Sequence, residues 1–275
     1  MERDSGIKPL KNCFNMRKIK SKRIVVKIGT NTLTDKNGLL DMKVISSLVS
    51  QIAKAKKGKD IVIITSGAIG AGMKELNIKE RPKDIVGKQV CAAVGQSILM
   101  STYQSLFNKY GIKVAQILLT YSDLTNPQTY NNLNNSLNRL FSLGAIPIIN
   151  ENDPISINEI GPSFGDNDNL SAMISSKIKA DLLVILTNVD GLYNKNPNDK
   201  DAVLINEVKN ITKEIEAMSG KPSNLGIGGM KTKIEAAKKA TKAGITVIIA
   251  NGRKENVLLK ATNGAGIGTV FYAKK

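Results

Sequence analysis

The 275 residues carry 40 Lys and Arg against 23 Asp and Glu, a net charge of +17, and 41% of them are hydrophobic. This length and hydrophobic content suit one large α/β domain or two small ones. Histidine is absent, which excludes Ser-His-Asp and Cys-His catalysis and histidine-based zinc sites. No apolar run approaches the ~20 residues of a membrane helix, so we expect a soluble protein with no membrane partner.

The positive charge is scattered along the chain, which favours a lysine-rich solvated surface over a nucleic-acid-binding face. An aromatic content of 4% without tryptophan also argues against a stacking platform for nucleic acid. The start of the chain is the most basic part but lacks the apolar core of a secretory signal. We expect a flexible tail over residues 1–22, with a weak transit peptide as the alternative, and a single domain over residues 23–275. Cys13 and Cys91 form no CxxC pattern, which fits a reducing, cytoplasmic compartment.

The first predicted element is a buried strand at residues 23–28, and the turn that follows places Lys27 near its carboxyl end. Taken alone, this lysine could equally extend to solvent from a strand edge. A second buried strand at 61–64 leads into the small-residue turn TSGAIGAG at 65–72 and then into a helix. Such a turn presents free backbone N–H groups to an anion, but its glycines could equally serve close packing. The residues alone leave both interpretations open.

Strands and helices alternate along the rest of the chain. The predicted elements are helices at 44–57, 88–110 and 131–143, strands at 114–119, 146–149, 182–187 and 246–250, a helix from Met230, and a closing strand at 268–271. This order implies a three-layer αβα sandwich with a mostly parallel, open central sheet. In such sheets ligands bind outside the carboxyl ends of the strands, where Lys27 and residues 66–72, 150–153 and 187–190 fall.

Two polar clusters, at residues 150–153 and 166–168, and the glycine-rich segment at 226–233 suggest phosphoryl transfer. That reaction needs positioning and neutralisation of charge on the moving group more than covalent help. Lysines at the glycine-rich ends could flank the phosphoryl group, and Asp168 could hold two ammonium groups together. No residue stands out as a general base, and an ionised carboxylate acceptor would require none.

Seven motifs carry a resemblance that spans residues 23–271. They are VVKIGT at 25–30, TSGAIGAG at 65–72, AAVGQ at 92–96, INEND at 149–153, FGDNDNLSA at 164–172, LTNVDGLY at 186–193 and GIGGMKTK at 226–233. In this combination the chain resembles the glutamate 5-kinases, amino-acid kinases that phosphorylate the side-chain carboxylate of L-glutamate at the start of proline synthesis. The resemblance therefore implies the amino-acid kinase fold, and L-glutamate and ATP as substrates.

The resemblance also implies site residues. The catalytic residues would be Lys27, Lys233 and Asp168; the substrate-binding residues Ser66, Gly67, Ala68, Asn150, Asp153, Asp166 and Asn167; and the ATP-binding residues Lys27, Gly29, Thr187, Asn188, Ile227, Gly228, Gly229, Met230, Lys231, Thr232 and Lys233. Mg²⁺ would bridge the ATP phosphates, with no dedicated metal site on the protein. Proline would act as feedback inhibitor, and the protein would form a homodimer or homotetramer.

Some positions depart from the family pattern. Asn188 stands where the family usually has Asp, Ile227 where it has Thr, and Asn134 where it has Arg. Many family members carry a C-terminal PUA domain, which we expect to be absent because the chain stops at Lys275. The alternatives are another amino-acid kinase (uridylate, acetylglutamate or carbamate kinase) or an inactive basic nucleic-acid-binding protein.

Overall fold

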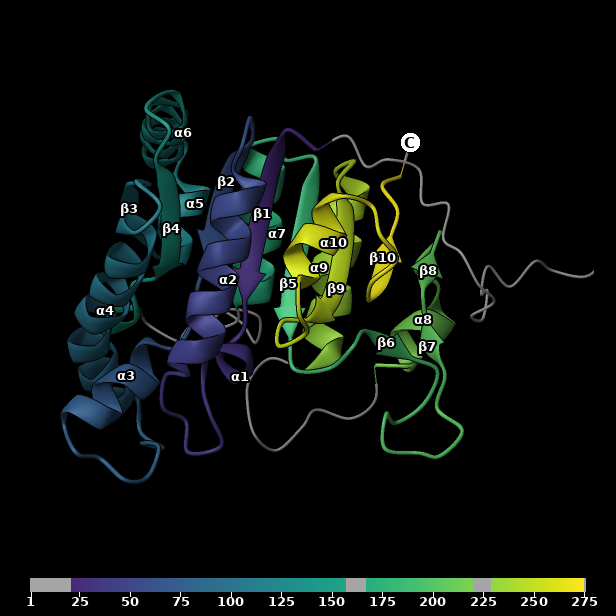
Figure 1. Cartoon of the computed structure of the whole chain (residues 1–275), viewed down its shortest axis with the longest axis horizontal. Coiled ribbons are helices and arrows are strands. Elements are labelled where there is room, and N and C mark those ends of the chain that lie inside the picture. The colour runs from purple at the N-terminus through teal and green to yellow at the C-terminus, as the bar shows by residue number, and fades with distance from the viewer. Residues whose placement is uncertain (1–20, 157–166, 220–228, 275) are drawn as a thin grey trace, which may run out of the picture. The chain divides into compact units, whose positions relative to one another are not determined.

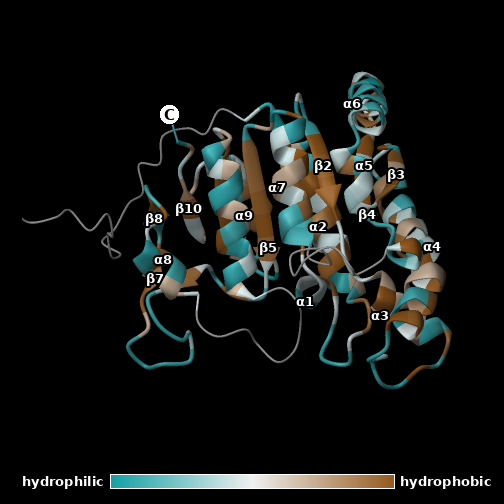
Figure 2. Ribbon diagram, turned by 180° about the vertical axis from the view of Figure 1, so that it is seen from behind, coloured by the Kyte–Doolittle hydropathy of each residue, from teal (hydrophilic) through white to brown (hydrophobic). Residues whose placement is uncertain are grey.

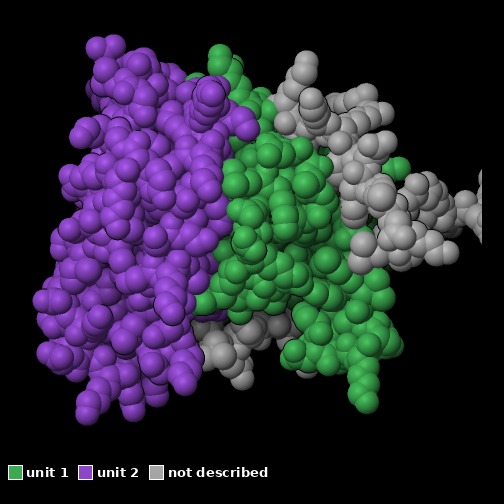
Figure 3. Space-filling view, viewed as in Figure 1, with its two compact units in different colours: residues 1–27, 168–275 green, residues 28–167 purple. Residues whose placement is uncertain are grey.

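The computed structural model of the protein describes residues 21–156, 167–219 and 229–274. The chain divides into two compact units, residues 28–167 and residues 1–27 with 168–275 (Figure 3). We call them the 28–167 unit and the 168–275 unit. The single domain expected over residues 23–275 stays a prediction, and most of the expected tail lies outside the described residues.

Three parallel strands, in the order β3-β4-β2, form the centre of the 28–167 unit. They are β2 (Asp60–Ile64), β3 (Val114–Leu119) and β4 (Ile146–Glu151). All six residues of β4 are buried, as expected for a strand covered on both faces. β4 is two residues longer than predicted, because its Asn150 and Glu151 still pair with Leu118 and Leu119 of β3. The INEND motif therefore begins inside the sheet.

Over residues 28–156, seven helical elements accompany these strands. They are α1 (Thr30–Leu33), α2 (Met42–Ala55), α3 (Ala68–Glu75), α4 (Ile85–Asn108), α5 (Tyr121–Thr125), α6 (Pro127–Ser142) and the 3₁₀ turn η1 (Asp153–Ile155). α6 begins four residues earlier than predicted, with Pro127 in its first turn. The Asn126 side chain accepts hydrogen bonds from the backbone of Gln128 and Thr129 there, which satisfies N–H groups that a helix start leaves free.

Glycines allow α3 and α4 to lie unusually close together. A Cβ atom on Gly95 of α4 would lie 1.8 Å from the carbonyl oxygen of Ala68, and one on Gly72 of α3 would lie 1.8 Å from that of Cys91. No real Cβ tolerates such distances to backbone, so both positions require glycine. For Gly72 the packing interpretation of the TSGAIGAG turn is therefore the one that holds. Gly67 has a different reason, a φ of +99° where the chain turns into α3.

The 168–275 unit has its own mostly parallel sheet, in the order β1-β5-β9-β10-β8. Its strands are β1 (Arg23–Ile28), β5 (Leu182–Thr187), β8 (Glu207–Val208), β9 (Thr246–Asn251) and β10 (Thr269–Phe271). β5 and β9 are parallel, whereas β10 runs antiparallel to β9. The helices are α7 (Asn167–Lys177), α8 (Lys213–Ala217), α9 (Met230–Lys242) and α10 (Val257–Thr262), and a short hairpin joins β6 (Leu192–Tyr193) to β7 (Leu204–Ile205).

Helices cover both faces of this second sheet. Figures 1 and 2 show α10 on one face and α7 and α9 on the other. Figure 2 also shows β5 as continuously hydrophobic, while α9 alternates between polar and apolar residues. Among the described residues, no helix is long and apolar enough to cross a membrane. The predicted three-layer αβα class with mostly parallel strands is confirmed. The two-residue strands were missed because they are too short to show a period.

Candidate active site

The 168–275 unit holds a buried aspartate between two buried lysines. Lys27 lies near the carboxyl end of β1, Asp168 in the first turn of α7 and Lys233 in the first turn of α9. The Lys27 Nζ lies 2.6 Å from Asp168 Oδ1, and the Lys233 Nζ lies 2.9 Å from Asp168 Oδ2. Asp168 is fully buried and the two lysines are 4% and 6% exposed. The structure thus brings together the three residues expected to be catalytic.

The two ammonium groups keep Asp168 ionised. Burial by itself would raise the pKa of this carboxyl, but the positive charges of Lys27 and Lys233 and their hydrogen bonds hold the pKa well below its usual range. The carboxylate in turn allows two like charges to stay together in a site shielded from water. This cluster can therefore place two lysine side chains around an anion.

The start of α9 adds further polar groups to this cluster. The Thr232 hydroxyl lies 2.9 Å from Asp168 Oδ2 and 2.9 Å from the carbonyl oxygen of Gly229. Met230 begins the helix, whose first N–H groups lack partners within the helix. Such a helix start favours a phosphate group. Lys231, in contrast, is exposed.

The carboxyl end of β5 carries the other expected nucleotide segment. Thr187 is buried there, while Asn188 is exposed and accepts a 3.3 Å hydrogen bond from the Thr187 hydroxyl. Of the other residues expected to bind ATP, Gly29 precedes α1 in the 28–167 unit. Ile227 and Gly228 lie outside the described residues.

A cluster of side-chain amides lies in the 28–167 unit. The Asn167 Nδ2 donates to the Thr65 carbonyl oxygen at 2.7 Å, to the Ser66 Oγ at 2.9 Å and to the Asn150 Oδ1 at 3.0 Å. The Asn150 Nδ2 donates to the Gln96 Oε1 at 2.9 Å. Three residues expected to bind substrate, Ser66, Asn150 and Asn167, are therefore in direct contact. We call Gln96, Asn150 and Asn167 the amide chain.

Among the described residues of this unit, Asp153, in η1, is the one expected substrate residue that carries a charge. Burial raises its pKa to about 6, and Arg81 opposes this shift only in part. Gly67 and Ala68 begin α3 directly after Ser66. Asp166 lies outside the described residues.

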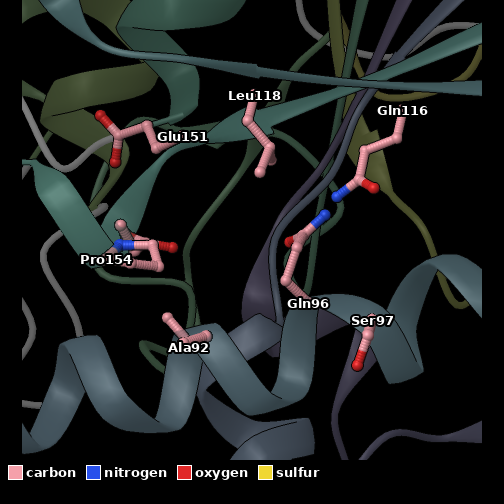
Figure 4. A pocket seen from close by; sticks show the side chains of 9 residues that line it. Ala92, Gln96, Ser97, Gln116, Leu118, Glu151 and Pro154 are labelled. Atoms are coloured by element: carbon pink, nitrogen blue, oxygen red, sulfur yellow. The ribbon is translucent and has the colours of Figure 1, made fainter.

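Gln96 was not among the predicted site residues, although it ends the AAVGQ motif. It lines a cavity of about 280 Å³ together with Glu151 and Asp153 (Figure 4). Its side chain carries no charge, and the glycine before it, Gly95, serves helix packing. A glutamine at this point of a helix gives no signal until the fold places Asn150 beside it.

The geometry supports one kind of chemistry. Buried ammonium groups and a helix start can stabilise a transferring phosphoryl group, and a cluster of amide, hydroxyl and carboxylate groups can bind a small polar acceptor. The two clusters are consecutive in the chain, because Asn167 and Asp168 are neighbours.

Comparison with solved structures places the fold. A UMP kinase from Bacillus anthracis superposes with a TM-score of 0.60 at 15% identity, covering 93% of this chain and 97% of that one. A UMP kinase from Ureaplasma parvum gives a TM-score of 0.62 at 16% identity, covering 92% and 99%. At this identity the likeness concerns the fold alone.

The sequence comparisons define the family. The model of the amino acid kinase family matches residues 22–251. The glutamate 5-kinase of Methanosarcina barkeri is 49% identical over 263 residues, covering 92% of this chain and 69% of the relative. That of Dehalococcoides mccartyi is 49% identical over 264 residues, covering 94% and 69%. The chain therefore belongs to the amino acid kinase family and, within it, to the glutamate 5-kinases. The resemblance drawn from the motifs is confirmed.

Proposed function

We propose that this protein transfers the γ-phosphoryl group of ATP to the side-chain carboxylate of L-glutamate, the first step of proline synthesis. A carboxylate oxygen of glutamate forms a bond to the γ-phosphorus while the bond to the β,γ-bridging oxygen breaks, giving L-glutamyl 5-phosphate and ADP. The acceptor is already ionised at neutral pH, so no general base is needed. The observation that carries this proposal is the buried pairing of Asp168 with Lys27 and Lys233.

Each part of the two clusters has a role in this reaction. Lys27 and Lys233 neutralise the charge that develops on the transferring group, and Asp168 holds both ammonium groups in place. The start of α9 and the end of β5 hold the nucleotide. In the 28–167 unit, Ser66 and Asn167 bind the substrate, and the ionised carboxylate of Asp153 binds its α-ammonium group.

Mg²⁺ would be carried mainly by the nucleotide. Over residues 21–156, 167–219 and 229–274 no three acidic, histidine or cysteine side chains gather as a metal site. We infer that the ion would be held by the ATP phosphates and would keep most of its water. When bound, the ion would neutralise phosphate charge.

Regulation and assembly are part of the same proposal. Proline shares the α-amino and carboxylate groups of glutamate, so we infer that it competes near the amide chain as a feedback inhibitor. We also infer a homodimer or homotetramer, because α4 exposes the apolar side chains of Ile85, Val86 and Val90. Because the reaction consumes ATP and glutamate, we place it in the cytoplasm.

A coupled assay of ADP release over glutamate, acetylglutamate, carbamate and UMP tests the acceptor. Activity is expected with glutamate alone, and the acyl phosphate should be trapped by hydroxylamine as the hydroxamate. Turnover of another acceptor in place of glutamate would refute the proposal.

Two lysines of α9 provide a matched pair of variants. Lys233→Met should lower kcat by about 10²–10³, the effect of removing one such donor. Lys238 lies on the same helix as Lys233 and forms an exposed ion pair with Glu216 of α8. Lys238→Met should leave kcat within twofold of the parent. Similar losses in both variants would remove the special role of Lys233.

A further inference from the structure

The amide chain has a direction that one backbone group imposes. The Thr65 carbonyl oxygen can only accept a hydrogen bond, so the Asn167 side chain must turn its nitrogen toward it. That nitrogen also donates to the Asn150 oxygen, which leaves the Asn150 nitrogen to donate to Gln96. Each amide thus determines the orientation of the next.

The two ends of the amide chain have unused capacity. Among the described residues, the buried Asn167 Oδ1 and the buried Gln96 Nε2 have no hydrogen-bond partner. An unmatched buried acceptor is unfavourable and calls for a donor from a ligand. At neutral pH the α-ammonium is the only donor group of glutamate, since both of its carboxylates only accept. The Asn167 oxygen therefore suits that ammonium.

We propose that Gln96 is a positioning residue that makes the site selective for acceptors with an α-ammonium group. Asn150 is 2% exposed, so its nitrogen has no water to replace Gln96 as acceptor. Without the Gln96 oxygen, the Asn150 amide is free to turn over, and its nitrogen would then face the Asn167 nitrogen. Asn167 would lose an acceptor, and its oxygen would no longer be held toward the substrate. This inference rests on the proposed glutamate kinase activity.

The experiment compares L-glutamate with glutarate, which has both carboxylates but no ammonium group. Gln96→Met keeps the length of the side chain and removes the acceptor. We expect it to raise KM for glutamate about tenfold, equivalent to 1.4 kcal/mol, with kcat and KM for ATP nearly unchanged. The affinity for glutarate, measured as an acceptor or as a competitive inhibitor, should change less than twofold. Gln96→Glu, which retains an acceptor oxygen, should restore most of the preference for glutamate.

Controls separate the possible failures. Thr102→Val changes another residue of α4, whose hydroxyl donates to the Ile98 carbonyl oxygen and which does not line the cavity, and should behave as the parent protein. If the parent protein shows no turnover of glutamate, the proposed function itself fails. If the parent protein is active and Gln96→Met weakens the binding of glutamate and of glutarate equally, or weakens the binding of neither, the positioning role is wrong. Gln96→Glu behaving like Gln96→Met would also overturn it, because the Gln96 nitrogen, which both variants lose, would then be the group that matters.

Discussion

Replacing Asp168 with asparagine tests the buried ion cluster most directly. The substitution keeps the shape of the side chain but removes the negative charge between two ammonium groups. At an effective dielectric constant of about 20, separations of 2.6 and 2.9 Å correspond to roughly 6 kcal/mol of attraction for each pair. Desolvation of the three groups offsets much of this attraction. Breaking a buried pair nevertheless destabilises a protein by about 3–5 kcal/mol, because an uncompensated charge stays buried.

The assay is equilibrium unfolding in urea at pH 7.5, with Asp201→Asn as the matched control. Asp201 forms an exposed ion pair with Lys195, so its loss should change the free energy of unfolding by less than about 1 kcal/mol. Asp168→Asn should lower the free energy of unfolding by about 3–5 kcal/mol and also lower kcat strongly. The pKa of Asp168 is lowered on folding, so its contribution is complete above the unfolded pKa of about 4 and is lost only at more acidic pH. The difference between the parent and Asp168→Asn should therefore shrink below about pH 4.

One result would refute this reasoning. If Asp168→Asn and Asp201→Asn unfold at the same urea concentration as the parent, the two lysines do not depend on Asp168. An unchanged kcat would refute the catalytic part independently.

Three further substitutions test other parts of the structure. Lys27→Met should lower kcat by about 10²–10³ with KM for glutamate within threefold, since its charge is used mainly in the transition state; a rise in KM alone would contradict this. The pKa of Asp153 is raised to about 6, so glutamate binding measured by calorimetry without ATP should weaken as pH falls from 7 to 5. The Asp153→Asn variant should bind glutamate weakly at every pH. The substitution should also stabilise the free protein at pH 7.5, because ionising the Asp153 carboxyl is unfavourable in the folded state. If this variant showed the same pH profile of glutamate binding as the parent, Asp153 would not bind the ammonium group of the substrate. Gly95→Ala should destabilise the protein by about 3 kcal/mol, because its Cβ would lie 1.8 Å from the Ala68 carbonyl oxygen. A parent-like melting temperature would show that α3 and α4 do not need this contact.

Two glycines of the TSGAIGAG turn, Gly67 and Gly72, show what the sequence left open. Both an anion-binding turn and close packing were compatible with TSGAIGAG. Gly72 lies against the Cys91 carbonyl oxygen and serves packing, whereas Gly67 serves the turn into α3. For Gly72 the choice depends on the backbone that lies opposite, and Cys91, 19 positions further along the chain, provides it.

The sequence by itself predicted the longer strands, the αβα class and the family, and it pointed to Lys27, Asp168 and Lys233. These follow from local patterns: apolar runs, helix starts and motifs whose residues are consecutive. Only the tertiary structure decided how the polar residues are used. Asn167 meets Thr65 across 102 residues of chain, and Asn150 meets Gln96 across 54. A hydrogen bond depends on distance and direction in space, which periodicity does not encode, so the role of Gln96 became visible only once the strands and α4 were in place.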